Sequence, residues 1–272
     1  MSERPVLPAY SMNQTNFPWL YERKVVGPIF EPWAKVMLDR ARISSGQSVL
    51  DVACGTGIVA RLAGARVGEA ARIVGVDVSG PMLAVAREIE PSIDWREGDA
   101  AALPIGPGER FDRVLCQQGL QFFGDRAAAA RELRRAVDPG GVALVAVWRS
   151  AREMPPYDEL QRVAERHLGV EIHDERYAFD DADALRRVLA EAGFRDVQVE
   201  TLSLTHRFPD AAEFVRMNAM ALVGMSGADL GDEERQRVLE AIVEESVTAV
   251  RSFMHGAAGV WDMRTNLAVA VP

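Results

Sequence analysis

Short apolar runs alternate with amphipathic stretches along the first 150 residues of the chain. The apolar runs predict strands at residues 48–53, 72–77, 92–97, 111–116 and 141–148. Most of the stretches between them carry the apolar spacing of a helix, and a further helix is predicted from Val26 to about Arg42. Strands that alternate with helices in this way are typical of a parallel sheet.

The regular alternation ends after Trp148. Helical spacing then predicts a segment that begins at an Asp180 N-cap and ends at Gly193, and further helices at 157–168, 210–224 and 232–252. Strands are predicted at 197–204, where the alternation slips near Leu202, and at 260–271. We therefore predict one Rossmann-like α/β domain with two helical insertions, 151–179 and 209–255, packed together over the ligand-binding edge of the sheet.

Composition narrows the class of protein. The chain has 272 residues, of which 48% are hydrophobic and 26% charged, as in ordinary globular enzymes. Its net charge of −9 argues against a nucleic-acid-binding surface, which needs a basic face. Two cysteines form neither a disulfide framework nor a zinc site, so no metal is expected. Neither a signal peptide nor a membrane-spanning run is evident, so a cytoplasmic protein without a membrane span is expected.

Acidic residues stand at or just past the ends of three predicted strands. They are Asp51, Asp77 and Asp99, and Asp51 leads directly into a glycine loop that contains Gly55 and Gly57. In an open α/β sheet, ligands bind at the edge formed by the carboxyl ends of the strands. Glycines let the backbone approach a ligand closely, and three carboxylates suit a cationic ligand that carries a ribose and an adenine. The pattern indicates S-adenosylmethionine.

The glycine loop alone does not settle which nucleotide-like ligand binds. Gly55-x-Gly57-x-x-Ala60, with Asp77 about 20 residues further on, also fits the looser dinucleotide fingerprint of NAD. Asp51 favours S-adenosylmethionine, because a carboxylate beside a pyrophosphate would cost on the order of several kcal/mol. The simpler interpretation of Asp51 is that it only caps loop amides.

The other two acids suit separate parts of the same ligand. Asp77 suits bidentate acceptance from two ribose hydroxyls; it could instead cap the next helix, although Ser79 is better placed for that. The Asp99 side chain suits the exocyclic amine of adenine, and the Ala100 amide suits a ring nitrogen.

Several motifs together resemble the class I S-adenosylmethionine-dependent methyltransferases, in particular small-molecule enzymes related to the ubiquinone and menaquinone C-methyltransferases. These motifs are Val49–Gly57, Gly75–Ser79, Gly98–Pro104, Phe111–Phe123, Leu133–Val147 and Leu185–Val199. The resemblance implies a seven-stranded Rossmann-like sheet with its last strand antiparallel and with helical cap insertions. The cofactor residues it implies are Asp51, Ala53, Gly55, Asp77, Val78, Met82, Asp99, Ala100 and Gln117.

The pattern of strands and helices, taken with this resemblance, divides the chain. Residues 46–150 would form the S-adenosylmethionine-binding core, continued by 180–208 and by a final core strand in 256–272. Residues 1–45 would be an N-terminal helical segment that covers the active site. Residues 151–179 would form a helical insertion, and 209–255 a helical cap.

Methyl transfer from a sulfonium is an in-line displacement that relies on alignment, and a general base is needed only if the acceptor must lose a proton. The catalytic assignment is open, and the candidates are Tyr21, Gln118 and Gln121. A surface or packing role is favoured for each of the four histidines. The methionine-rich stretch 209–226 suggests an apolar acceptor pocket that includes Trp148, Met217 and Met220, although core packing would explain these side chains equally well.

The leading hypothesis is therefore a methyltransferase that acts at O, N or C of an apolar small molecule, expected to be a secondary metabolite, in a monomer or homodimer. Two alternatives stay open. One is an NAD(P)-dependent oxidoreductase, which Asp51 disfavours. The other is a non-catalytic S-adenosylmethionine-binding partner protein, against which the extended cap argues.

Overall fold

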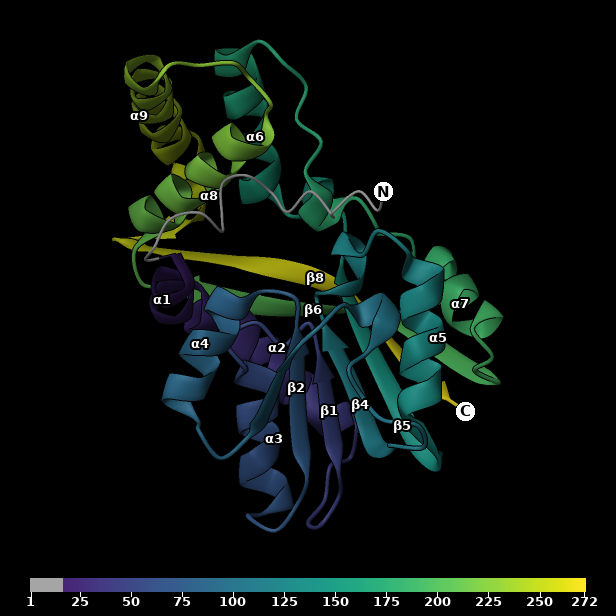
Figure 1. Cartoon of the computed structure of the whole chain (residues 1–272). Helices are drawn as coiled ribbons and strands as arrows, with labels where there is room; N and C mark the ends of the chain where they lie inside the picture. Colours follow the sequence, from purple (N-terminus) through teal and green to yellow (C-terminus); the bar gives the residue numbers. More distant parts are fainter. Residues whose placement is uncertain (1–16) are drawn as a thin grey trace. The chain divides into compact units, whose positions relative to one another are not determined.

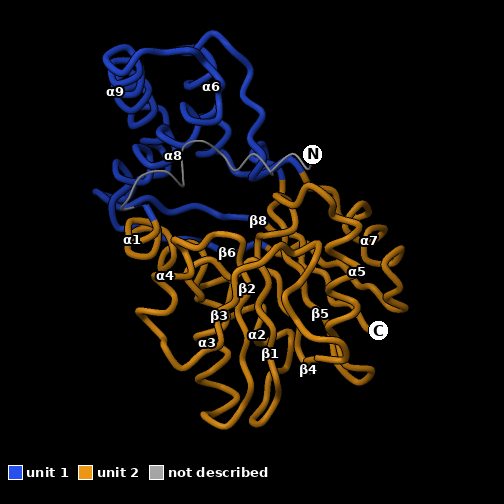
Figure 2. Tube along the Cα trace, in the orientation of Figure 1, with its two compact units in different colours: residues 1–17, 150–178, 203–264 blue, residues 18–149, 179–202, 265–272 orange. Residues whose placement is uncertain are grey.

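A computed structural model describes residues 17–272, and the first 16 residues of the predicted N-terminal covering segment lie outside this range. The chain forms two compact units (Figure 2). We call residues 18–149, 179–202 and 265–272 the sheet unit. The helical unit contains Phe17 and residues 150–178 and 203–264. The boundaries at Leu202 and Arg264 fall inside strands that we had assigned to the core.

The sheet has the strand order β3-β2-β1-β4-β5-β8-β6 (Figure 1). Strands β1 to β5 pair in parallel, and β8 runs antiparallel to β5 with Ala143 opposite Ala270. This confirms the expected Rossmann-like sheet with an antiparallel last strand. The difference is the two-residue strand β7, which pairs with the start of β8. The strands are β1 Val49–Val52, β2 Ile73–Asp77, β3 Asp94–Glu97, β4 Phe111–Gln117, β5 Val137–Trp148, β6 Asp196–Phe208, β7 Met254–His255 and β8 Ala258–Val271.

Apolar residues of the sheet unit bury both faces of the sheet, as expected for parallel strands. One cluster joins Val52 and Val145 to Leu133 of α5 and Leu189 of α7. Another joins Leu115 to Leu38 of α2 and Val59 of α3. The helices concerned are α2 Glu31–Arg40, α3 Ile58–Val67, α4 Gly80–Ile89, α5 Arg126–Ala136 and α7 Ala182–Glu191. Helices α3, α4 and α5 begin directly after the loops that follow β1, β2 and β4.

The N-terminal helix differs from the prediction. Helix α1 spans Phe17–Tyr21 and continues as a π-helix, Glu22–Phe30, before α2 begins. The Glu31 amide donates to the Val26 carbonyl five residues earlier. Pro28 lies inside the π-helix and has no amide hydrogen, so a regular α-helical ladder cannot pass through it. The single α-helix predicted over residues 26–42 was therefore wrong at its first turns.

Two boundaries in the second half also differ. Asp181, not Asp180, caps α7, and its side chain accepts from the Asp183 amide. The Asp180 carbonyl instead accepts from Arg149 and from Asn266, each at 2.7 Å. Strand β6 extends to Phe208, because side chains continue to alternate between exposed and buried beyond the predicted end.

The helical unit has a small core of its own. Helix α6, Pro155–Leu168, packs against α8, Ala211–Met225, and α9, Asp232–Ala249. Aromatic rings fill the centre: Phe208 stacks on Trp261 at 4.4 Å, and Phe214 lies 5.1 Å from Tyr157. Short 3-10 turns complete the unit at Ala151–Glu153, Glu175–Tyr177 and Val250–Phe253. That this unit covers the ligand-binding edge stays a prediction.

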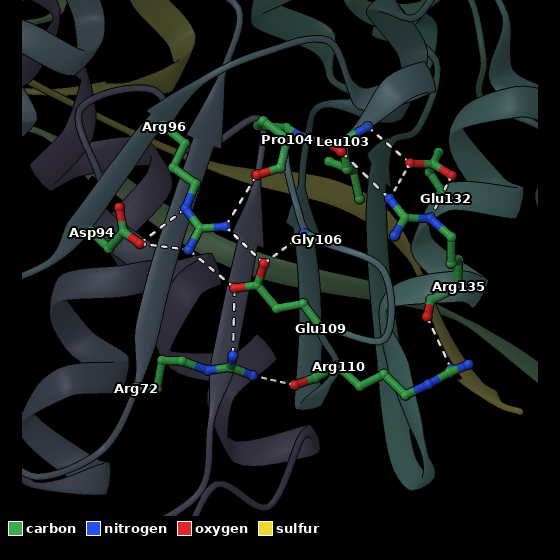
Figure 3. Close-up of polar contacts among 10 residues, drawn as sticks. All are labelled: Arg72, Asp94, Arg96, Leu103, Pro104, Gly106, Glu109, Arg110, Glu132 and Arg135. Carbon is green, nitrogen blue, oxygen red and sulfur yellow. Dashed lines mark hydrogen bonds and ion pairs between the residues drawn. The ribbon is translucent and has the colours of Figure 1, made fainter.

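Several ion pairs between side chains lie around the segments that enter β4 and β5 at their amino ends (Figure 3). Arg96 donates to Glu109 at 3.0 Å and to Asp94 at 2.6 Å. On α5, Arg135 pairs with Glu132 at 2.6 Å. The hydrogen bonds from Arg96 lower the pKa of Glu109, and those from Arg135 lower the pKa of Glu132. Arginine partners thus neutralise the carboxylates in this region.

Two negative findings concern residues 17–272. No helix within that range is both long enough and apolar enough to cross a lipid bilayer. Nor do three or more histidine, cysteine or acidic side chains gather there as a potential metal site.

Candidate active site

Asp51 is the penultimate residue of β1 and is almost fully buried. Its Oδ2 accepts from the Ala60 amide at 3.0 Å, so it does cap the helix that follows the glycine loop. Burial, and to a smaller extent the nearby charge of Asp77, raises the pKa of Asp51 to about 8 against the opposing hydrogen bond from the Ala60 amide. A carboxyl group held in this way favours a cationic neighbour.

Asp77 closes β2 and holds two loops together. Its Oδ2 accepts from the Gly55 amide at 2.7 Å, and its Oδ1 accepts from the Ser79 amide at 2.8 Å. Burial raises the pKa of Asp77 against the opposing effect of these amides. Ser79 is the residue that caps α4, accepting from Met82, as expected. The Val78 amide also hydrogen-bonds this carboxylate, which retains acceptor capacity for a further donor.

The glycine loop serves two purposes that the sequence did not separate. A Cβ on Gly57 would lie 2.2 Å from the Trp95 ring of β3, so this glycine is required by packing within the protein. A Cβ on Gly55 would meet nothing within 4 Å, although its φ of +57° is left-handed. Gly55 is thus the member of the loop that leaves room for a ligand.

The remaining predicted cofactor residues lie after β2 and β3. Val78 is 44% exposed, and Met82 lies half-buried in the first turn of α4. Asp99 is exposed and caps the 3-10 turn Ala100–Ala102 through the Ala101 amide. Ala100 is buried beneath it.

A cationic, phosphate-free ligand fits this set of residues. The two buried carboxyls have raised pKa values, so a sulfonium or ammonium would stabilise their ionised forms. A pyrophosphate would instead add negative charge beside them. The residues present therefore suit S-adenosylmethionine, with Gly55 as the open part of the cradle.

Three glutamines lie at or just after the carboxyl end of β4: Gln117 is the last residue of the strand, Gln118 and Gln121 follow it, and each is more than nine-tenths buried. Gln117 Nε2 donates to the Phe30 carbonyl at 3.0 Å, and Gln118 Nε2 donates to Thr265 Oγ1 at 3.0 Å. Their amide oxygens have no hydrogen-bond partner among the described residues, and neither amide atom of Gln121 has one. This loop lies against the glycine loop, because a Cβ on Gly119 would lie 2.6 Å from that of Ala53.

Aromatic side chains of the sheet unit pack near Phe30, the residue whose carbonyl accepts from Gln117. The ring of Tyr21 lies 5.4 Å from that of Phe30, which is 6.2 Å from Trp148 at the end of β5. Trp33 meets Trp148 edge-on at 6.0 Å. Two predicted residues, Tyr21 and Trp148, thus belong to one aromatic group, joined by Phe30 and Trp33, which sequence reasoning had assigned only to a helix.

The predicted pocket methionines lie elsewhere in the chain. Met217 and Met220 are half-buried on α8 of the helical unit, whereas Trp148 belongs to the sheet unit. A pocket shared by these residues stays a prediction.

Sequence reasoning missed Thr265 on β8. It lies opposite Trp148 in the antiparallel ladder and is 1% exposed. A single threonine in an apolar strand carries no local signal of such a contact, and only the pairing of β5 with β8 could have indicated it.

Comparisons with known proteins identify the family. A family model described as a methyltransferase domain matches residues 49–141. A demethylmenaquinone methyltransferase of Shouchella clausii is 30% identical over 190 residues, which cover 62% of this chain and 79% of the relative. A 2-phytyl-1,4-naphtoquinone methyltransferase of Thermosynechococcus vestitus is 34% identical over 146 residues, 48% of this chain and 64% of the relative.

The fold has solved counterparts. A phosphoethanolamine N-methyltransferase of Haemonchus contortus, solved with phosphomonomethylethanolamine and S-adenosylhomocysteine, superposes with a TM-score of 0.58 at 20% identity. The match covers 95% of this chain and 57% of that one. Relatives and fold agree with the carboxylate-lined strand ends, and the chain belongs to the class I S-adenosylmethionine-dependent methyltransferases.

Proposed function

We propose that this protein transfers the methyl group of S-adenosylmethionine to an O, N or C atom of an apolar small molecule, in the cytoplasm and as part of secondary metabolism. The observation that carries the proposal is the pair of buried carboxyls, Asp51 and Asp77, with raised pKa values beside an open Gly55. The two quinone-related relatives support an apolar, ring-bearing acceptor.

In this proposal each strand end holds one part of the cofactor. Asp77 accepts from the two ribose hydroxyls, while Asp99 and the Ala100 amide receive adenine, flanked by Val78 and Met82. Asp51, Ala53 and Gly55 face the methionine end. Gln117, whose amide nitrogen is bound to Phe30, offers its oxygen to the methionine ammonium.

The bound cofactor supplies an activated methyl group whose thioether leaves without protonation. The protein therefore has to align the acceptor with that methyl and exclude water, and such alignment contributes about 7–11 kcal/mol in well-oriented reactions. Tyr21 and its aromatic neighbours would orient an apolar acceptor from the N-terminal side.

Met217 and Met220 would line the acceptor pocket from α8, because flexible thioethers adapt to irregular apolar ligands. We expect Met217→Ala and Met220→Ala to raise the acceptor Michaelis constant. A Michaelis constant and turnover unchanged in both variants would remove these residues from the pocket.

The proposal is tested by turnover. The protein is incubated with S-adenosylmethionine and a panel of phenols, amines and quinols, and S-adenosylhomocysteine and methylated products are measured by mass spectrometry. We expect at least one apolar acceptor to be methylated. Cofactor binding without turnover on any member would favour the non-catalytic partner protein instead.

A further inference from the structure

Gln118 has a side chain whose amide orientation is fixed by its neighbours. The Thr265 hydroxyl donates its only proton to the Val147 carbonyl at 2.7 Å, so its oxygen can only accept from Gln118. The group that faces it at 3.0 Å must therefore be the amide nitrogen. This assignment follows from the hydrogen-bond chain and leaves the Gln118 oxygen pointing away from Thr265.

The backbone reinforces this arrangement. Gln118 has a φ of +53°, which a non-glycine residue rarely adopts because its Cβ is then strained. The backbone N–H of Gln118 donates to the Ala146 carbonyl at 2.9 Å, which anchors the residue to the end of β5. The strained backbone and the Thr265 contact together set the direction of one polar atom.

That atom, Gln118 Oε1, is buried and has no hydrogen-bond partner among residues 17–272. A buried acceptor without a hydrogen-bond donor is destabilising, because it has lost its contacts with water. Gln121, three residues further on, is 2% exposed, and neither its amide oxygen nor its amide nitrogen has a hydrogen-bond partner among residues 17–272. Arg126 holds the carbonyls of Leu120 and Gln121, so this short turn is also fixed.

The position of this segment points to the methyl acceptor. Gly119, between the two glutamines, lies against Ala53 of the glycine loop, where the methionine end of the cofactor is proposed to bind. Gln117, Gln118 and Gln121 are uncharged, so they offer hydrogen bonds here without adding a charge.

We propose that Gln118 Oε1, positioned by Thr265, accepts a hydrogen bond from an O–H or N–H group of the methyl acceptor. The acceptor class is then a neutral phenol, enol or amine, and an anionic phenolate is disfavoured because an amide oxygen repels it. This inference rests on the proposed function and deepens it by naming the polar group that the site recognises.

Gln118 orients the acceptor and does not act as a base. The acceptor's lone pair forms the new bond to the methyl carbon, and the electrons of the broken S–C bond return to sulfur. The proton of the O–H or N–H group leaves afterwards to water. Thr265 is a positioning residue, since it acts only through Gln118.

The test compares 1-naphthol with 1-methoxynaphthalene, which lacks the donor, as ligands of the protein saturated with S-adenosylhomocysteine. Calorimetry should show that the wild type prefers 1-naphthol by about tenfold. Gln118→Leu and Thr265→Val should abolish this preference. Thr265→Ser keeps the hydroxyl and should retain it.

Two further measurements keep the outcomes distinct. Affinity for S-adenosylhomocysteine should stay unchanged in all three variants, and circular dichroism should show that each is folded. Equal binding of the two naphthalenes by the wild type, no binding of either, or a preference retained in Gln118→Leu would overturn the inference. Failure of the wild type to bind S-adenosylhomocysteine would instead contradict the proposed function.

Discussion

Carboxylates at the two ends of the parallel strands have pKa shifts of opposite direction. At the amino ends, Arg96 and Arg135 donate to Glu109 and Glu132 and lower the pKa of each (Figure 3). At the carboxyl ends, burial and the nearby charge of Asp77 raise the pKa of Asp51 to about 8, although one amide hydrogen bond opposes the shift.

This difference separates a structural region from a functional one. Arginine side chains neutralise the carboxylates at the amino ends, and the same type of pairing could have been used at the carboxyl ends. Buried acids with raised pKa values tend to occur where a ligand or a reaction needs them. The carboxyl ends of β1 and β2 thus have the electrostatics of a site for a cation.

The largest expected effect is at Asp77. Asp77→Ala removes the acceptor for two loop amides and for the ribose, and should weaken S-adenosylhomocysteine binding at least tenfold, or about 1.4 kcal/mol. Glu109→Gln is the matched control at the other end and should leave the dissociation constant unchanged. An unchanged constant in Asp77→Ala would refute its ribose role.

A second effect concerns pH. Below pH 8 Asp51 is largely protonated, and a bound sulfonium or ammonium would lower its pKa, so binding should release a proton. Affinity for S-adenosylmethionine should rise from about pH 6 to pH 8, by at most about tenfold per unit, and then level off. Titrations of Asp51→Asn should lose this dependence; a flat wild-type profile would show that Asp51 does not face the cation.

The same shift affects the stability of the free protein. The pKa of Asp51 is raised above the unfolded value of about 3.9, so its contribution to stability is full below that pH. The contribution is then lost as the pH rises toward 8. Urea unfolding of the wild type and Asp51→Asn between pH 5 and pH 8 should show a smaller decline in the variant.

A third effect tests how closely the loops after β1 and β4 pack against each other. Gly119→Ala places a Cβ 2.6 Å from that of Ala53 and 3.0 Å from Cys116 Sγ, and overpacking of this kind typically costs about 1–3 kcal/mol. Adding Ala53→Gly should recover part of the free energy of unfolding. Gly140→Ala, where a Cβ meets nothing within 4 Å, is the control and should be milder. Equal losses at Gly119 and Gly140 would contradict the close contact of the two loops.

The smallest effect is at the amino ends. Glu109→Gln weakens the pairing with Arg96, a partly exposed interaction worth about 0.2–1 kcal/mol. The melting temperature should fall slightly while cofactor affinity stays the same. A change in affinity as large as that of Asp77→Ala would erase the distinction between the two ends.

The sequence predicted what depends on local pattern. The strands of the sheet and the acids at their ends follow from apolar runs bounded by Asp51, Asp77 and Asp99. Ser79 as an N-cap followed from its position before α4. The winding of residues 22–30 did not, because the π-helix depends on how Pro28 is accommodated.

What the sequence could not predict depends on contacts between distant residues. Gly57 is needed because Trp95 covers it, a contact made between β3 and the glycine loop. Thr265 holds the Gln118 side chain by a hydrogen bond, although the two residues lie 147 positions apart in the sequence. Neither residue type in its local setting indicates such a partner.

The central claim is that the carboxyl ends of β1 and β2 bind a cationic methyl donor. Calorimetric titration of the wild-type protein at pH 8 with S-adenosylmethionine and, separately, with NAD tests it most directly. We predict saturable one-to-one binding of S-adenosylmethionine and no measurable binding of NAD. Tight binding of NAD with none of S-adenosylmethionine would contradict the account.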